Sequence, residues 1–213
     1  SGRLGVLEAA ECPPTFNTHP SQVQAIIAGG RRAVFSSQEG AEDDRAAARR
    51  IVRQRVRRSD VVVGIAASGI TPFVMEGLRA AARQGAKTVL VTCHPHSAAP
   101  ASLRIALNVG PEVLTGSTRL KAATATKLVL NMLTLGAMVQ LGKTYGNLMV
   151  DVRPTSRKLR ARALRIIQTA TGLNIIEVEA RKDEPVAPLE EVRDKIREAI
   201  LDHVASQGEG GAR

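Results

Sequence analysis

The sequence of 213 residues has very few aromatic side chains, no tryptophan and only two cysteines. Aromatic residues make up 2% of the chain against 44% for all hydrophobic residues. Valine, isoleucine, leucine and alanine must therefore fill the core, which favours an α/β layered fold over an aromatic-rich β-sandwich. Cys12 and Cys93 are too few for a disulfide framework and fit a reducing compartment.

Long uninterrupted apolar segments are also scarce. No apolar run reaches the roughly 18 residues that a membrane-spanning helix needs, and no secretory signal sequence opens the chain. We therefore expect a soluble cytoplasmic protein with no membrane partner. Because Ser1-Gly2-Arg3 has the composition of a turn, we also expect a first strand ahead of it that this sequence does not include.

Acidic residues are outnumbered, since 20 Asp and Glu face 30 Lys and Arg and leave a net charge of +10. Many of the arginines gather in residues 45–58. Such a cluster is typical either of a nucleic-acid-binding patch or of a solvated helix face. No aromatic side chain is interleaved there to stack on bases. We favour the solvated face and expect no nucleic-acid partner.

Short apolar runs alternate with helical patterns over the first 141 residues. The apolar runs predict strands, the clearest buried on both faces, at residues 22–28, 60–67, 87–93 and 105–109. The other patterns predict helices at residues 4–11, 41–58, 72–84 and 117–141. Strands and helices in this alternation predict an α/β fold in three layers, a parallel sheet flanked by helices.

The character of the chain changes after Asp151. A linker at residues 153–158 leads to amphipathic helices near 159–171 and 189–205, with a polar break at 181–188 between them. We expect an α/β domain at residues 1–152, a small helical C-terminal extension at 153–205 and a disordered tail at 206–213.

The most informative stretch is residues 112–131. A loop rich in hydroxyl groups runs into a long Ala/Leu-rich segment that carries Arg119, Lys121 and Lys127. Backbone N–H groups at a helix start, hydroxyl donors and nearby cations together predict an anion site for a phosphorylated small molecule. We assign Ser117, Thr118 and Lys121 to that site, although Lys121 would also suit a polar helix face.

A second hydroxyl-rich turn follows the strand predicted at residues 60–67. Ser68, Gly69 and Thr71 lie between that strand and a helix that begins with Pro72, where ligands of parallel sheets bind. Ser1 opens a third such turn. Serine and glycine are also ordinary turn and cap residues, but three such turns at strand ends favour phosphate binding.

Other groups of potentially functional residues give weaker evidence for a site. Cys93-His94-Pro95-His96 lacks a further ligand cluster nearby, so we interpret it as a loop after a strand and expect no metal. Cys12 lacks a local histidine partner and fits a structural role. No nucleotide-binding fingerprint occurs, and we expect no cofactor.

Several longer motifs in one order resemble the N-acetylmuramic acid 6-phosphate etherase family, which has the sugar isomerase (SIS), flavodoxin-like fold. The resemblance covers residues 1 to about 171. It rests on SGRLGVLEAAECPPTF (1–16), EGAED (39–43), GIAASG (64–69), the 112–131 stretch and YGNLMVDV (145–152). It implies a homodimer in which the apolar helix around residues 128–141 is a contact surface.

The resemblance also implies an activity. The family cleaves the D-lactyl ether of N-acetylmuramate 6-phosphate by elimination and hydration during cell-wall amino sugar recycling, giving N-acetylglucosamine 6-phosphate and D-lactate. It implies that Glu11 is the general acid and Glu42 the base at C2, which requires one neutral and one ionised carboxyl group. By position alone, either residue could equally be a surface charge or a helix-start carboxylate.

The chain departs from the family pattern at several positions. Ile70 stands where arginine is common, Ala123 and Thr126 where glycine and glutamine are, and Leu120 where methionine is. The residues after 171 scarcely match. Two other functions use the same fold, a non-catalytic phosphosugar-sensing module and an aldose–ketose isomerase. The motifs around Glu11 and Glu42 together favour the etherase.

Overall fold

The computed structural model describes residues 2–152 and 156–171. They fall into two compact units. The first combines the chain up to Cys12 with His19–Gly136, and the second combines Pro13–Thr18 with the residues from Ala137 onward.

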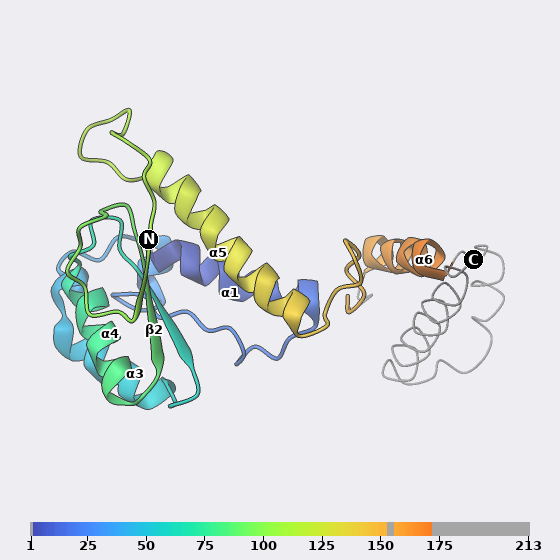
Figure 1. Ribbon diagram of the computed structural model, residues 1–213, viewed down its shortest axis with the longest axis horizontal. Helices are drawn as coiled ribbons and strands as arrows, with labels where there is room; N and C mark the ends of the chain where they lie inside the picture. The colour runs from blue at the N-terminus through green and yellow to red at the C-terminus, as the bar shows by residue number, and fades with distance from the viewer. Residues whose placement is uncertain (1, 153–155, 172–213) are drawn as a thin grey trace, which may run out of the picture. The chain divides into compact units, whose positions relative to one another are not determined.

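The first unit is an α/β layer structure around a three-stranded parallel sheet (Figure 1). β1 (Val61–Ile65), β2 (Lys87–Thr92) and β3 (Leu103–Ala106) lie side by side in that order. Val61 pairs with Lys87, and Val89 pairs with Leu103. Helices lie on both sides of the sheet, so the prediction of an α/β fold with a parallel sheet flanked by helices is confirmed.

Close packing of α4 (Pro72–Arg83) against β1 depends on a glycine. A Cβ atom at Gly64 would lie 2.8 Å from Val74 Cγ1 and 2.9 Å from Leu78 Cδ1. Without that atom, Leu78 becomes almost fully buried and packs with Ala66, Met75 and Leu90 in one core cluster. On the outer side of α4, α3 (Arg45–Arg55) contributes Val52 to a second cluster with Ala80, Ala81 and Ala86.

α1 (Gly2–Phe16) and α5 (Lys121–Gln140) lie on the other side of the sheet (Figure 1). A Cβ atom at Gly5 would lie 3.4 Å from the Ile65 side chain, so this turn of α1 packs at the end of β1. Within the first unit the two helices are joined by polar contacts, which Asn131 and Thr134 of α5 make to the Glu8 carboxylate.

The described part of the second unit contains the ends of α1 and α5 and the helix α6 (Arg157–Thr171). Tyr145 and Leu148 form an isolated antiparallel bridge, and Lys143 makes an ion pair with Asp151. α6 begins inside the segment predicted as a linker and matches the helix predicted near residues 159–171. The predictions for residues 172–213 lie outside the described residues, as does Ser1.

Two predicted helix boundaries are wrong. Residues 41–58 do not form one helix, because Asp44 interrupts them: its Oδ1 accepts a hydrogen bond of 2.8 Å from the Ala47 amide and starts α3 at Arg45. Before it, Ala41–Asp43 form only a 3-10 turn, η1. α1 extends past the predicted end at Glu11 and through Pro13 and Pro14, and burial of Phe16 in its last turn offsets the lost backbone bonds.

Two strand predictions are also wrong. Residues 22–28 form turns and irregular backbone, since no strand among the described residues pairs with them. β3 begins at Leu103 and ends at Ala106, ahead of the predicted 105–109, because Ser102 Oγ donates to the Thr88 carbonyl at 2.6 Å and fixes an earlier register. β1 is only half-buried at most positions, because it is an edge strand in the described sheet.

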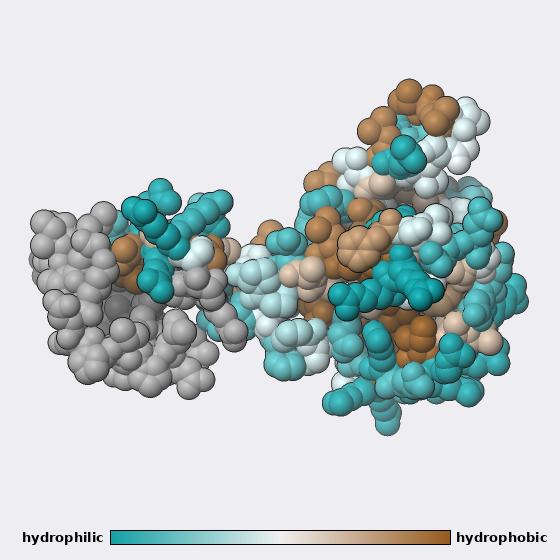
Figure 2. Space-filling model, turned by 180° about the vertical axis from the view of Figure 1, so that it is seen from behind, coloured by the Kyte–Doolittle hydropathy of each residue, from teal (hydrophilic) through white to brown (hydrophobic). Residues whose placement is uncertain are grey.

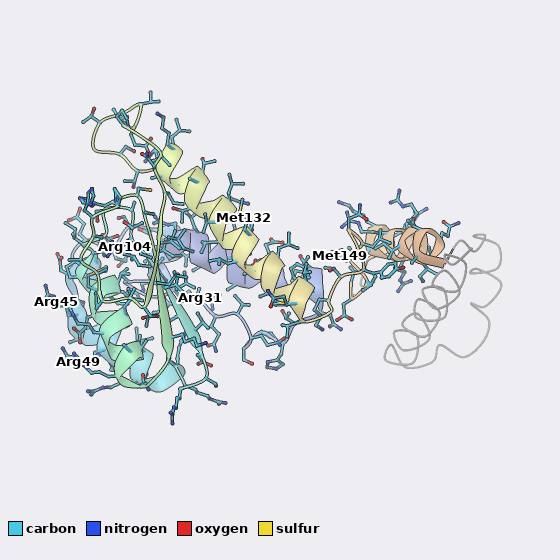
Figure 3. All side chains as sticks on the ribbon, in the orientation of Figure 1. Arg31, Arg45, Arg49, Arg104, Met132 and Met149 are labelled. Atoms are coloured by element: carbon cyan, nitrogen blue, oxygen red, sulfur yellow. The ribbon has the colours of Figure 1, made fainter. Side chains whose placement is uncertain are left out.

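One helix among the described residues, α5, is long and apolar enough to cross a membrane. The expectation of no such segment considered only uninterrupted apolar runs. α5 has threonine and asparagine among its apolar residues, but its mean hydropathy is still high enough. Only 22% of the apolar 18-residue window in this helix is buried, so α5 is not a typical core helix. Met132 illustrates this, since it projects from α5 and is 64% exposed (Figure 3).

Candidate active site

A cavity of about 230 Å³ lies beside β1 in the first unit. β1 contributes residues 62–65 to one wall, and residues 24–28 form another. α4 contributes Phe73, Val74 and Leu78. These walls are mainly apolar, and the polar side chains at the cavity come from a short set of residues: Arg3, Gln24, Ser37, Gln38, Glu42 and Thr71.

The turn between β1 and α4 is built around Gly69, whose φ of +71° favours glycine. Its carbonyl accepts a hydrogen bond of 2.6 Å from Ser97 Oγ, and its amide donates to the Ala66 carbonyl at 2.9 Å. Ser68 is exposed, and its Oγ lies 3.5 Å from the Ile70 amide. Thr71 is the N-cap of α4, but its side chain makes no capping bond. The Thr71 hydroxyl is thus not committed to the helix it precedes.

Glu42 and Thr71 line the same cavity although they are far apart in the sequence. Glu42 is held in the η1 turn, which follows Gly40 with its φ of +71°. Arg3 lines this cavity as well, and its Nε donates to the Val34 carbonyl at 2.8 Å. Arg3 was not predicted as a site residue. The turn predicted at Ser1-Gly2-Arg3 is wrong over its described part, because Gly2 and Arg3 already belong to the helix α1.

Glu11 does not line this cavity. It is an exposed residue of α1 next to Cys12, which is 2% exposed. Burial raises the pKa of the Cys12 thiol, and the charges of Glu8 and Glu11 raise it further. The structure therefore brings Glu42 and Thr71 together and leaves Glu11 outside their cavity.

The start of α5 differs from the simple anion site predicted there. Both carboxylate oxygens of Glu112 are used, because they accept hydrogen bonds from the backbone amides of Lys121 at 3.1 Å and Ala122 at 3.0 Å. The Ala122 bond does most to lower the Glu112 pKa, and it outweighs the opposite effect of partial burial. Lys121 Nζ donates to the Pro111 carbonyl at 2.9 Å. An anion at this helix start would compete with Glu112.

The hydroxyl groups of the loop before α5 remain available. Thr118 is exposed and Ser117 is half-buried, and Ser117 Oγ lies 3.4 Å from the Arg119 amide. The loop also presents Val113 and Leu114, which are largely exposed, and the brown atoms at the top of Figure 2 mark its tip. Neither Ser117, Thr118 nor Lys121 lines the cavity beside β1.

The histidine- and cysteine-containing loop after β2 folds on itself. His94 and His96 form an edge-to-face ring pair with centroids 6.3 Å apart, and the Thr92 hydroxyl accepts from the His94 amide at 3.1 Å. Over residues 2–152 and 156–171, no group of three or more His, Cys, Asp or Glu side chains is placed to hold a metal ion.

Comparison with family models identifies one fold over most of the first unit. Residues 1–82 match the glucokinase regulatory protein N-terminal SIS domain. Residues 42–136 match the SIS domain. The matches overlap across η1, α3, β1 and nearly all of α4, and the overlap includes the turn that carries Ser68, Gly69 and Thr71.

Curated relatives carry one name. The chain is 51% identical over 203 residues to an N-acetylmuramic acid 6-phosphate etherase of Symbiobacterium thermophilum, covering 94% of this chain and 65% of the relative. A Gloeobacter violaceus protein of that name is 51% identical over 210 residues, which cover 97% of this chain and 66% of that protein. A Rhizobium rhizogenes protein of that name is 48% identical over 216 residues, or 100% and 68%. The chain thus spans about two thirds of the length of these relatives.

Proposed function

This chain belongs to the N-acetylmuramic acid 6-phosphate etherase family, and we propose that it cleaves the D-lactyl ether of N-acetylmuramate 6-phosphate. The products are N-acetylglucosamine 6-phosphate and D-lactate. The observation that carries the proposal is the cavity beside β1, which Glu42 and Thr71 both line. The cavity lies beside β1, and ligands of parallel sheets bind beyond the carboxyl ends of their strands.

Glu42 is the proposed base. When the sugar ring opens, C2 lies next to the C1 aldehyde, so its proton is acidic enough for a carboxylate to remove. Glu42 takes that proton, the C3–O bond to lactate breaks, and a C2=C3 double bond conjugated with the aldehyde remains. Glu42 is itself exposed, and the apolar walls from β1 and α4 line the cavity beside it.

Glu11 is the proposed acid. It gives a proton to the lactyl ether oxygen as the C3–O bond breaks, and lactate leaves as its free hydroxy acid. Water then adds its oxygen to C3 and gives a proton back to Glu11, while Glu42 returns its proton to C2. The net change is one water consumed and one ether bond cleaved. The exposure of Glu11 on α1 leaves its carboxyl group accessible to a substrate.

We assign the phosphate first to the turn of Ser68, Gly69 and Thr71. α4 begins there with Pro72, and no side chain caps it in the structure, so a phosphate has both a helix start and hydroxyl donors. Ser117, Thr118 and Lys121 form the second proposed contact, and Glu112 must give way if phosphate approaches the α5 amides. Ser1 completes the proposed set.

Two measurements test this function on the same sample. D-Lactate release from N-acetylmuramate 6-phosphate reports the whole reaction, and exchange of the C2 proton with solvent deuterium reports the base alone. Glu42→Gln should lose both by about 10²–10⁴-fold, while Glu11→Gln should lose release and keep exchange. Glu39→Gln is the matched control, because Glu39 is an exposed glutamate of the same motif. A Glu42→Gln variant that still exchanges the C2 proton would refute the base assignment.

A phosphosugar-sensing role is the second candidate, and one observation favours it. Residues 1–82 match the SIS domain of a regulatory protein, and Glu11 lies outside the cavity that holds Glu42. A sensor would bind N-acetylmuramate 6-phosphate without releasing lactate or exchanging the C2 proton. An aldose–ketose isomerase would exchange the proton and form a ketose, so product analysis separates all three functions.

We further propose a homodimer that uses α5. Leu128, Met132 and Leu135 follow a four-three spacing that places them on one helix face, and each is about half exposed or more. An exposed apolar stripe of this kind is typical of a contact between subunits. Met132→Lys should convert a dimer to a monomer in sedimentation velocity. We also propose a cytoplasmic location, since the substrate is a sugar phosphate and both cysteines are free.

A further inference from the structure

Glu8 is the one carboxylate that the described part of α1 buries, since it is 8% exposed while Glu11, one turn later, is exposed. The Glu8 Oε2 atom accepts a hydrogen bond of 2.5 Å from Asn131 Nδ2, and Thr134 Oγ1 donates to Glu8 Oε1. Lys127 Nζ in turn donates to Asn131 Oδ1 at 2.8 Å. Glu8, Asn131 and Thr134 therefore form a polar clamp between α1 and α5.

A buried clamp of this kind is a poor way to gain stability. Removing a carboxylate from water costs several kcal/mol before its partners compensate, and apolar side chains of similar volume often serve as well or better. The clamp instead fixes geometry, because two hydrogen bonds to one carboxylate limit how far α1 can slide or rotate along α5. Apolar contacts allow such movement at much lower cost.

The clamp lies close in sequence to the proposed acid, Glu11, on α1 and joins that helix to α5. Glu11 lies three residues after Glu8, on the neighbouring side of α1, so the setting of Glu8 determines where Glu11 lies. α5 carries Asn131 and Thr134, and its first turn follows the loop of Ser117 and Thr118. The clamp therefore relates the proposed acid on α1 to a proposed phosphate contact at the start of α5.

We propose that Glu8 is a positioning residue that holds Glu11 at the distance from bound phosphate that protonation of the leaving lactate requires. The inference rests on the proposed etherase function. Glu8 touches no reacting atom and acts through the placement of Glu11. Because small misplacements of a catalytic group lower rates strongly, we expect loss of the clamp to slow lactate release by about 10–100-fold.

The test compares three versions of the 213-residue chain with the parent. The apolar variant Glu8→Met/Asn131→Leu/Thr134→Val replaces the whole clamp, so no buried polar group is left unpaired. Glu8→Gln keeps one hydrogen-bond acceptor and a similar side-chain shape, so it should retain most of the parent rate of lactate release. Thr134→Val removes one donor with almost no change in volume. D-Lactate release and C2 proton exchange are measured together, and their ratio does not depend on the folded fraction.

The apolar variant should resemble Glu11→Gln, with C2 exchange retained and the ratio of release to exchange lowered about 10–100-fold. Thr134→Val should lower the ratio in the same direction by less. Should the apolar variant keep the parent ratio, the inference is wrong while the etherase function stands. Equal loss of release and exchange would also overturn it, because the clamp would then support the whole fold. A parent chain with neither release nor exchange would refute the proposed function, and the inference with it.

Discussion

The carboxylate of Glu76 on α4 accepts a hydrogen bond of 2.9 Å from Nε of Arg49 on α3. Glu76 is 5% exposed, whereas the Arg49 side chain is 46% exposed and reaches from α3 to α4. Arg83 and Arg79 also reach Glu76, at 3.4 and 3.8 Å. One buried carboxylate thus gathers three arginines and joins the two helices on that side of the sheet.

Replacement of Glu76 should destabilise the first unit. We expect Glu76→Gln to lower the free energy of unfolding by about 1 kcal/mol, because the amide keeps one acceptor but loses the charge-assisted bond. The expected loss is modest because all three arginine side chains are about half exposed to water. Urea denaturation followed by circular dichroism measures the change. Glu39→Gln, at an exposed site, is the control and should shift the midpoint little; equal effects of the two changes would contradict the role of Glu76.

The same cluster makes stability depend on pH in the acid range. Burial alone would raise the pKa of Glu76, but the hydrogen bond from Arg49 and the charges of Arg49 and Arg83 lower it below its ordinary value of 4.5. Since the native pKa is the lower one, the contribution is complete above 4.5 and is lost as the pH falls through the native pKa. The melting temperature of Glu76→Gln should therefore differ from that of the parent at about pH 7 and converge with it once the pH falls below the native pKa of Glu76. A difference that persists in acid would contradict this account.

Gly69 is predicted to tolerate no side chain. A Cβ atom there would lie 2.6 Å from both Cβ and Oγ of Ser97, in a backbone conformation that favours glycine. Gly69→Ala should therefore cost about 1–3 kcal/mol in stability and should weaken binding of the substrate phosphate at this turn. Gly136→Ala is the matched control, since Gly136 is helical with open space around it and alanine there should be neutral or slightly stabilising. Thermal melts with and without N-acetylmuramate 6-phosphate measure both effects.

The start of α3 gives a similar contrast between neighbours. Asp44 caps the helix through the Ala47 amide, whereas Asp43 lies in the η1 turn before it. Asp44→Ala should cost about 1 kcal/mol, and Asp43→Ala should cost less. Urea denaturation of the two variants measures the difference. Equal losses, or a larger loss at Asp43, would show that Asp44 does not start the helix.

The sequence predicted those elements whose signal is local. β1, β2 and α4 follow from apolar runs and from Pro72, and the structure places them within a few residues of the predictions. The interruption at Asp44 was missed because an aspartate inside a helical pattern reads equally as a first-turn charge or as a cap. The strand prediction for residues 22–28 was wrong for a different reason. An apolar run becomes a strand only beside a partner strand, and that partner is not a property of the run itself.

The candidate site was predictable residue by residue but not as a geometry. The motifs singled out Glu42 and Thr71, yet only the fold brings them to one cavity. Glu112 had been counted as the first residue of an anion-binding stretch, whereas its own carboxylate occupies the backbone amides at the start of α5. The partners of Glu8 are more than a hundred residues away in the sequence, at Asn131 and Thr134, so no local pattern announces the clamp.

Both thiols should react slowly with alkylating reagents in the native protein. Burial raises the pKa of Cys12 and of Cys93 above the ordinary value of 9.0, with the charges of Glu8 and Glu11 adding to the first and that of Glu112 to the second. The reactive thiolate is therefore scarce at neutral pH, and Cys12 is also 2% exposed. Iodoacetamide at about pH 7.5 should modify Cys12 at least ~10-fold more slowly in the native chain than in urea, and more slowly than the half-buried Cys93. Cys12→Ser and Cys93→Ser isolate the two rates by mass spectrometry. Rapid native modification of Cys12 would mean that α1 opens readily, which would contradict a fixed clamp at Glu8.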